Sequence, residues 1–170
     1  MNATRCRGVF TYDEMVAAAM ARFKAHGDIR LARWVAWELA SLCDALWPGA
    51  LLVPVPGSPR NARRRGWDHM EEVARELRRR GLMTSRLLTR RDGPEQKGLD
   101  REARRTSVSR SLVLRDARRL RVGAEQARPM PRTVVLIDDV RTTGATIEAA
   151  ATLLRCGGYS VEGAAMLAVR

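Results

Sequence analysis

The chain is poor in several residue types that mark particular classes of protein. Its 170 residues include only two Phe, two Tyr and two His, and its three cysteines lie far apart in the sequence. With so few aromatic residues, stacking of single-stranded nucleic acid on the surface is weakly supported. Because no CxxC pair occurs, a zinc site is also unsupported, and we expect free thiols in a reducing compartment.

Long apolar runs are missing as well. No stretch approaches the length of a membrane span, and the first residues, MNATRCRGVFTYDE, contain no apolar core of a signal peptide. The hydrophobic fraction of 45% and the charged fraction of 29% are ordinary for a globular protein. We therefore expect a single domain over residues 1–170, located in the cytoplasm and without membrane insertion.

Lysine is nearly absent, although the chain is strongly basic. Of 31 basic residues only Lys24 and Lys97 are lysines, and the formal net charge is +12. The excess of arginine could reflect a GC-rich genome, so by itself it does not indicate nucleic-acid binding. Clusters of arginine still attract polyanions such as pyrophosphate or DNA, and they lie at 60–65, 78–80, 86–91, 101–105 and 115–121.

One stretch, VVLIDDVRTTGAT at 134–146, predicts both a fold and a binding site. Its four leading apolar residues suit a strand that is buried on both faces of a parallel sheet. Asp138 and Asp139 follow this strand, and a Thr/Gly turn then leads into apolar residues at helical spacing. We therefore expect both acids at the carboxyl end of a parallel strand, where open α/β sheets bind their ligands.

The turn after the acids has the chemistry of a phosphate site. Gly144 lets the backbone approach a ligand closely, and the N-terminus of the following helix favours an anion. The residues of this predicted site are Thr142, Thr143, Gly144, Ala145 and Thr146. Since the neighbouring carboxylates suit hydroxyl groups, the two sites together describe a pocket for ribose 5-phosphate. The alternative is a buried strand, a turn and a capped helix that bind no ligand.

The remaining patterns predict alternating helices and strands. Helices are expected at about 12–25, 29–46, 67–80 and 145–155, and strands at 51–56, 87–88, 111–115 and 160–169, the last of which could lie at a sheet edge. Residues 57–66 are expected to form a basic loop. The polar stretch 91–109 is interpreted as a closing lid, with a surface loop as the alternative.

The chain resembles a known family in several of these stretches. The acid pair and the Thr/Gly turn resemble the phosphoribosyl-pyrophosphate (PRPP) motif of type I phosphoribosyltransferases. Over roughly residues 12–170 the chain is similar to the ComF family, phosphoribosyltransferase-like proteins associated with competence for DNA uptake. The likeness rests on RFKAHGDIRLARWVAWELA (22–40), VPVPGSPRNARRRGWDHMEEVARELRR (53–79) and QKGLDREARRTSV (96–108).

This resemblance implies a fold and some departures from the family pattern. The implied fold is α/β and type I phosphoribosyltransferase-like, with a mostly parallel central sheet flanked by helices. An N-terminal helical cap (1–47) would cover a PRPP-binding core (48–170) that carries a flexible lid loop. We expect the four-cysteine zinc-finger segment of many members to be absent. Asp68 and His69 stand where an Asn-Gln pair is common, and Arg141 replaces an apolar residue.

The resemblance also implies an activity. The protein would bind PRPP and, with Mg²⁺, transfer its ribose 5-phosphate group to an unidentified acceptor with release of pyrophosphate. Asp138 and Asp139 would hold the ribose hydroxyls, and residues 142–146 would hold the 5′-phosphate. The ion would be bound through substrate oxygens and water, with no direct protein ligand.

Arginines are the expected partners of the pyrophosphate. In the basic loop Arg60 is the first candidate, as a catalytic and pyrophosphate-binding residue, followed by Arg63 and Arg64. In the lid, the residues that could cover the leaving group are Gln96, Arg101, Arg104 and Arg105. No general base is evident, since His69 could approach the pocket but is more simply a surface or packing residue.

Two other classes of function stay open. The protein could bind PRPP or a nucleotide without turnover, or could contact DNA or DNA-uptake proteins. The sequence does not name the acceptor, and a homodimer is neither required nor excluded.

Overall fold

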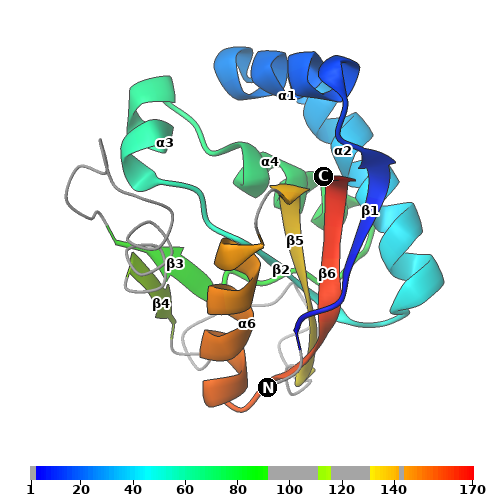
Figure 1. Ribbon diagram of the computed structural model, residues 1–170, viewed down its shortest axis with the longest axis vertical. Helices are drawn as coiled ribbons and strands as arrows, with labels where there is room; N and C mark the ends of the chain where they lie inside the picture. The colour runs from blue at the N-terminus through cyan, green and yellow to red at the C-terminus, as the bar shows by residue number, and fades with distance from the viewer. Residues whose placement is uncertain (1–2, 92–110, 116–130, 142–143) are drawn as a thin grey trace.

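A four-stranded parallel sheet organises the molecule. The computed structural model describes residues 3–91, 111–115, 131–141 and 144–170. The order of the strands across the sheet is β1-β6-β5-β2, and each neighbouring pair is parallel. These strands are β1 (Cys6–Thr11), β2 (Leu51–Pro54), β5 (Thr133–Arg141) and β6 (Ser160–Val169). The predicted α/β fold with a mostly parallel central sheet flanked by helices is confirmed (Figure 1).

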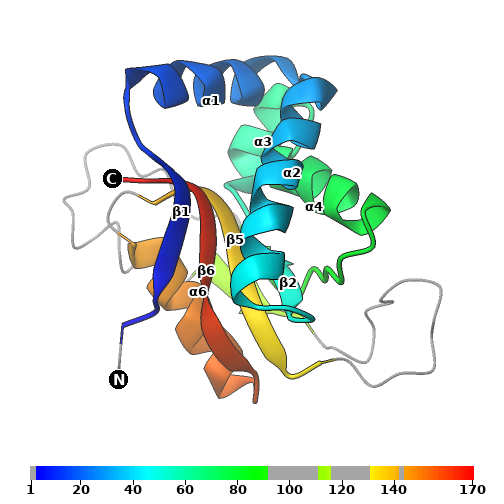
Figure 2. The same ribbon diagram turned by 90° about the vertical axis from the view of Figure 1, so that its right-hand side faces the viewer.

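Helices cover both faces of this sheet (Figure 2). The helices in the described residues are α1 (Glu14–His26), α2 (Ile29–Leu46), α3 (Pro59–Arg65), α4 (His69–Arg79) and α6 (Ala145–Cys156). On β5, Val135 and Ile137 pack with residues of α2 and α4, while Val134 and Leu136 pack with residues of α6. All four side chains are fully buried, as expected for a strand covered on both faces.

The first strand was not predicted, and it changes the place of the last one. β1 pairs in parallel with β6, so β6 lies between β1 and β5 and not at a sheet edge. Residues 6–11 therefore belong to the sheet, and within the predicted helical cap only α1 and α2 are helical. The strand CRGVFT is short and contains an exposed arginine, which an edge strand tolerates because only one of its sides is paired.

The basic stretch after β2 is helical rather than a loop. Ser58 precedes α3, Pro59 occupies its first turn, and Gly66 ends it with φ of 78°. Proline at a helix start and glycine in the left-handed conformation just past a helix end are common helix boundaries. A separate helix, α4, then begins after Asp68. The Asp68 side chain caps this helix, because it accepts hydrogen bonds from the backbone N–H groups of Met70 and Glu71. The helix predicted at 67–80 is thus confirmed, but the loop predicted at 57–66 was wrong.

The two short strands predicted on either side of the polar stretch form a hairpin. β3 (Leu88–Arg90) pairs antiparallel with β4 (Leu112–Leu114), and both contribute to the packing on the α6 side of the sheet. The predicted lid, including Gln96, Arg101, Arg104 and Arg105, lies outside the described residues. None of the helices described is both long enough and apolar enough to cross a membrane.

Candidate functional site

The site begins where two neighbouring strands end. β5 continues past its apolar run to Arg141, so Asp138 and Asp139 are the sixth and seventh residues of the strand rather than part of the following turn. β2 ends beside them, and the backbone N–H of Val55 donates to the carbonyl of Ile137 at 2.9 Å. The segment that leads from β2 into α3 is therefore held alongside the acid pair. This agrees with the prediction that the acids lie at the carboxyl end of a parallel strand.

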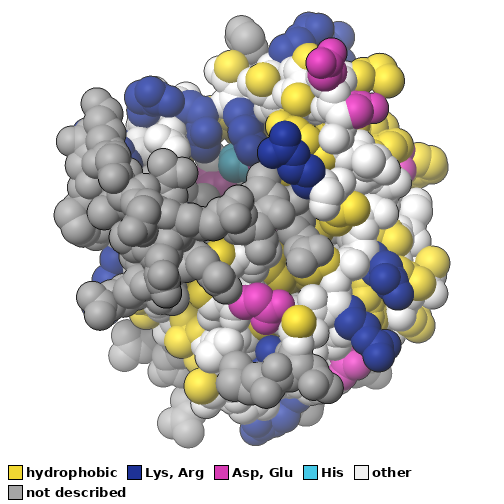
Figure 3. Space-filling model, in the orientation of Figure 1, with side chains coloured by type: hydrophobic (Ala, Val, Ile, Leu, Met, Phe, Trp, Pro, Cys, Tyr) yellow, Lys and Arg dark blue, Asp and Glu magenta, His cyan; other side chains and the backbone are white. Residues whose placement is uncertain are grey.

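Side chains from six elements converge on a cavity of about 280 Å³ at this end of the sheet. The space-filling view shows a hollow with acidic and histidine side chains at its floor and basic side chains on its rim (Figure 3). The charged and polar residues that line it come from α1, α3, α4, β3, β5 and α6, and from Ser58, which precedes α3. They are Lys24, Ser58, Asn61, Arg65, His69, Arg90, Asp138, Asp139 and Thr146. A cavity with cations around a floor of two acids suits a ligand that carries both hydroxyl and anionic groups.

Asp139 is engaged by two basic side chains. It is 7% exposed, its Oδ2 lies 3.0 Å from Nε2 of His69, and the Lys24 ammonium forms an ion pair with the same oxygen. Its Oδ1 accepts the backbone N–H of Val140 at 2.6 Å. Burial alone would raise the pKa of Asp139, but the hydrogen bond from His69 and the charge of Lys24 outweigh it and hold this pKa well below its usual range. Asp139 is therefore ionised across the physiological range.

Asp138 has the opposite electrostatic environment. Its Oδ1 accepts the backbone N–H of Asp139 at 2.9 Å, and no basic side chain in the described residues forms an ion pair with it. Burial and the negative charge of Asp139 raise the pKa of Asp138 well above its usual value. Two adjacent carboxyl groups with pKa values pushed in opposite directions are typical of functional sites. A ligand that donates hydrogen bonds or brings positive charge to Asp138 would relieve this cost.

The N-terminus of α6 supplies the anion-binding part of the cavity. Gly144 precedes the helix with φ of 75° and, as a glycine, makes no side-chain capping hydrogen bond. Thr146, in that first turn, lines the same cavity as the two acids. The N–H groups and the positive dipole end at the start of a helix favour an anion such as a phosphate. Of the predicted phosphate-binding residues, Gly144, Ala145 and Thr146 are thus placed at the cavity end of α6, whereas Thr142 and Thr143 lie outside the described residues.

The helical form of α3 decides which of its arginines reaches the acids. Asn61 and Arg65 are four residues apart, so they lie on one helix face, and both line the cavity with Asp138 and Asp139. Arg63 lines a neighbouring cavity, whereas Arg60 and Arg64 line neither of these two cavities. Arg65 was not singled out from the sequence, because a loop gives no helical phase from which to choose among adjacent arginines.

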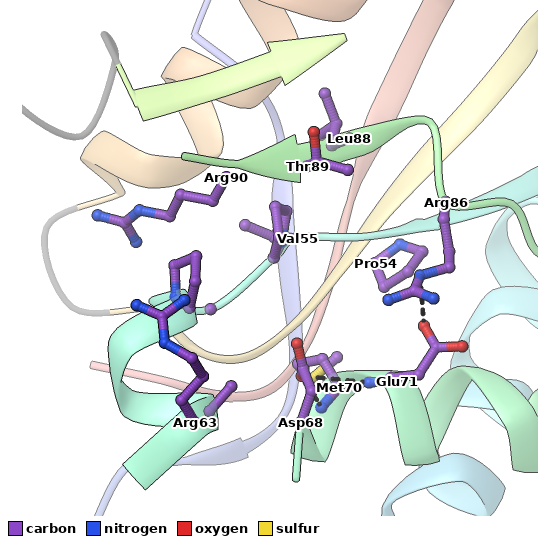
Figure 4. A pocket seen from close by; sticks show the side chains of 14 residues that line it. Pro54, Val55, Arg63, Asp68, Met70, Glu71, Arg86, Leu88, Thr89 and Arg90 are labelled. Atoms are coloured by element: carbon purple, nitrogen blue, oxygen red, sulfur yellow. Dashed lines mark hydrogen bonds and ion pairs between the residues drawn. The ribbon is translucent and has the colours of Figure 1, made fainter. Parts of the chain in front are cut away.

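A second cavity of about 340 Å³ adjoins the first (Figure 4). The two share Val55, Pro56, Gly57, Met70 and Arg90 as lining residues. Arg63 and Arg90 come from opposite sides of the second cavity, and its far end is closed by an ion pair of 2.9 Å between Arg86 and Glu71. A ligand at the acid pair therefore has open space beside it, with guanidinium groups at the boundary.

His69 and Lys24 also contact the acid pair, although neither was among the predicted site residues. His69 both packs and reaches the site, since its ring lies at 5.9 Å from that of Phe23 and its Nε2 contacts Asp139. His69 is thus a packing residue, as the simpler expectation had it, and it also approaches the cavity, as the alternative had it. For Lys24 the available signal was its rarity, because a lysine in a chain that otherwise uses arginine invites a specific explanation.

The donor groups of the site do not form a protein-made metal centre. Within residues 3–91, 111–115, 131–141 and 144–170, no group of three or more His, Cys, Asp or Glu side chains is arranged to hold a metal ion. The Asp139 oxygens already accept bonds from Lys24, His69 and Val140. These residues fit a divalent ion only if it is held mainly by oxygens of a ligand and by water, which Mg²⁺ tolerates well.

Comparison with known proteins agrees with the family predicted from the motifs. No family model matches the chain. The competence protein ComFC of Bacillus subtilis (strain 168) is 28% identical to it over 150 residues, which cover 87% of this chain and 57% of that protein. The chain thus spans little more than half the length of this curated relative. The similarity supports membership of the ComF family.

Proposed function

We propose that this protein binds PRPP at the carboxyl end of its parallel sheet and transfers the ribose 5-phosphate group to an acceptor, releasing pyrophosphate. One observation carries the proposal. The acid pair of β5 and Thr146 in the first turn of α6 line one cavity, together with lysine and arginine side chains from three other elements. A diol site beside an anion site, with further cations close by, matches the three polar parts of PRPP.

Each part of the ligand has a counterpart in the cavity. Asp138 and Asp139 would accept hydrogen bonds from the two ribose hydroxyls, and the first turn of α6 would hold the 5′-phosphate. Arg65 and Arg90 would face the pyrophosphate, because both line the cavity and Arg90 also lines the adjoining one. The predicted roles of Arg60, Arg63 and Arg64 in binding pyrophosphate stay predictions, with Arg63 the best placed of the three.

Transfer requires that the bond between the anomeric carbon and the pyrophosphate breaks as positive charge develops on the sugar. The ionised Asp139, held in place by His69, would stabilise that charge from beside the ring. Holding both ends of the ligand would fix the orientation of the anomeric carbon for attack by an acceptor from the face opposite the pyrophosphate. Mg²⁺, bound through ligand oxygens, would neutralise part of the leaving group's charge.

Calorimetric titration of PRPP with MgCl₂ tests this proposal. The wild type should bind, and Asp138→Asn should lose at least tenfold in affinity, because the amide cannot accept two hydroxyl hydrogen bonds as a carboxylate does. Asp44→Asn is the matched control, since Asp44 is exposed on α2 away from the cavity and should leave the affinity unchanged. A well-folded wild type that does not bind PRPP would refute the proposal.

A second candidate function is a binding role in DNA uptake without turnover. It is favoured by the similarity to a competence protein and by the net charge of +12. The two functions differ in a simple measurement, the dependence of DNA affinity on salt. A steep fall in affinity between 50 and 200 mM salt, on the order of 10³-fold, is expected for a protein that makes several phosphate contacts. A flat response would count against DNA as a partner.

A further inference from the structure

The ion pair between Lys24 and Asp139 has no role in the function proposed above. Lys24 lies near the end of α1, a helix that crosses the carboxyl end of the sheet (Figure 1). Its ammonium reaches Asp139 in the cavity. Its side chain remains 36% exposed, whereas Asp139 is buried. The stem of Lys24 is anchored because Phe23, its neighbour on α1, is fully buried against Trp67. The Lys24 ammonium is therefore held beside the acid pair at the end of a partly exposed side chain.

This cation competes with a hydroxyl that approaches the Oδ2 atom of Asp139. The Oδ1 atom of Asp139 accepts the backbone N–H of Val140, and Oδ2 accepts from His69 as well as from Lys24. Because Oδ2 already has two partners, a ribose hydroxyl that bonds to this oxygen would share or replace the place of Lys24. Because His69 is buried and keeps its own bond to this oxygen, Lys24 is the partner that can move.

The stereochemistry of PRPP determines which ligand group the Lys24 ammonium would contact after it leaves Asp139. The pyrophosphate of PRPP projects from the same face of the ribose ring as the two hydroxyls. A ligand that places its hydroxyls on the acid pair thus brings the pyrophosphate to the same side of the ring as the ammonium. An ammonium group suits such an exchange, since it is a compact charge with three rotatable donors, whereas a guanidinium would bind the carboxylate in a fixed bidentate geometry.

We propose that Lys24 is a pyrophosphate-binding residue that is stored on Asp139 in the empty site and transferred to the ligand on binding. The inference rests on the proposed function, because it takes PRPP as the ligand. In the empty site Lys24 keeps Asp139 ionised. In the complex the ammonium contacts a pyrophosphate oxygen, and Asp139 becomes available to a ribose hydroxyl. One lysine thereby serves both states of the site.

Three ligands and two variants test this assignment at pH 8. Affinities for PRPP, pyrophosphate and ribose 5-phosphate are measured by direct or competition calorimetry with the wild type, Lys24→Met and Arg75→Met. Lys24→Met should weaken PRPP and pyrophosphate at least tenfold and change ribose 5-phosphate less than twofold. Arg75→Met, which removes the same charge from an exposed position on α4 outside the cavity, should change none of them.

The outcomes separate the inference from the proposed function. If the wild type does not bind PRPP, the proposed function fails. If it binds and Lys24→Met binds all three ligands equally well, only the inference fails. An equal loss for ribose 5-phosphate and PRPP would also overturn it, because Lys24 would then act only through Asp139. Lys24→Arg restores the charge and should recover part of the pyrophosphate affinity in a protein with wild-type circular dichroism. No recovery would contradict the assignment.

Discussion

At the scale of single residues, the two adjacent acids of β5 have opposite effects on stability. Asp139 is ion-paired with Lys24 and hydrogen-bonded to His69, so its charge is stabilised in the folded protein. Burial and the negative charge of Asp139 disfavour the charge of Asp138. A buried charge without a partner costs stability, and proteins retain such costs mainly where function needs them. The environment of Asp138 therefore supports its place as a ligand-binding group.

Substitution of each acid by asparagine should separate these effects. At pH 7, Asp138→Asn should raise the free energy of unfolding by about 1 kcal/mol, since it removes a disfavoured charge. Asp139→Asn should lower it by about 1 to 3 kcal/mol, since Lys24 and His69 lose their charged partner. Urea unfolding of both variants checks the signs. Destabilisation by Asp138→Asn would contradict the electrostatic account of the site.

The pH dependence follows from the direction of each pKa shift. Because the pKa of Asp139 is lowered on folding, its contribution is present above its unfolded value of about 3.9 and is lost as the pH falls below that value. Because the pKa of Asp138 is raised on folding, ionisation of Asp138 lowers the free energy of unfolding as the pH rises above about 3.9. The advantage of Asp138→Asn over the wild type should thus disappear near pH 4 and increase toward pH 7.

At the scale of elements, the helical phase of α3 places Arg65, and not Arg64, at the cavity that contains both acids. Arg65→Met should weaken PRPP binding at least tenfold, because Arg65 lines the cavity that contains both acids. Arg64→Met is the matched control on the next residue of the helix, lines neither described cavity, and should change the affinity less than threefold. Calorimetric titration of both variants compares them. Equal losses would contradict the claim that the helical phase of α3 distinguishes Arg65 from Arg64.

The same elements show which parts of the fold could be predicted. The strand before the acids, the α6 helix and the hairpin were predicted correctly, because unbroken apolar runs and helical spacing are local signals. β1 was missed since an edge strand needs only a half-buried pattern, and α3 was missed since none of its residues is buried. A helix without an apolar face leaves no periodic signal in the sequence.

The candidate site was predicted in part for a related reason. Asp138, Asp139 and the start of α6 are contiguous in sequence, so a motif could find them together. Lys24, Arg65 and His69 reach the cavity from three separate segments, and their convergence depends on how α1, α3 and α4 pack over the sheet. Tertiary packing of this kind is not encoded in spacing along the chain.

At the scale of the whole molecule, the net positive charge and the cationic side chains of the cavity both favour anionic ligands. The net charge of +12 favours the approach of any polyanion, whether PRPP or DNA, and so does not by itself distinguish an enzyme from a DNA-contacting protein. The distinction lies in the cavity at the carboxyl end of the sheet. Long-range charge would speed association, whereas the acids, the α6 N-terminus and the basic side chains would give selectivity for a phosphorylated ribose.

The most direct test of this account is a crystal structure of the wild-type protein with PRPP and Mg²⁺. We predict that both ribose hydroxyls lie within about 2.6 to 3.2 Å of the Asp138 and Asp139 carboxylates, with the 5′-phosphate on the first turn of α6. The Lys24 ammonium should then contact the pyrophosphate instead of Asp139. PRPP bound elsewhere on the molecule, or an unchanged cavity at a saturating ligand concentration, would contradict the central claim.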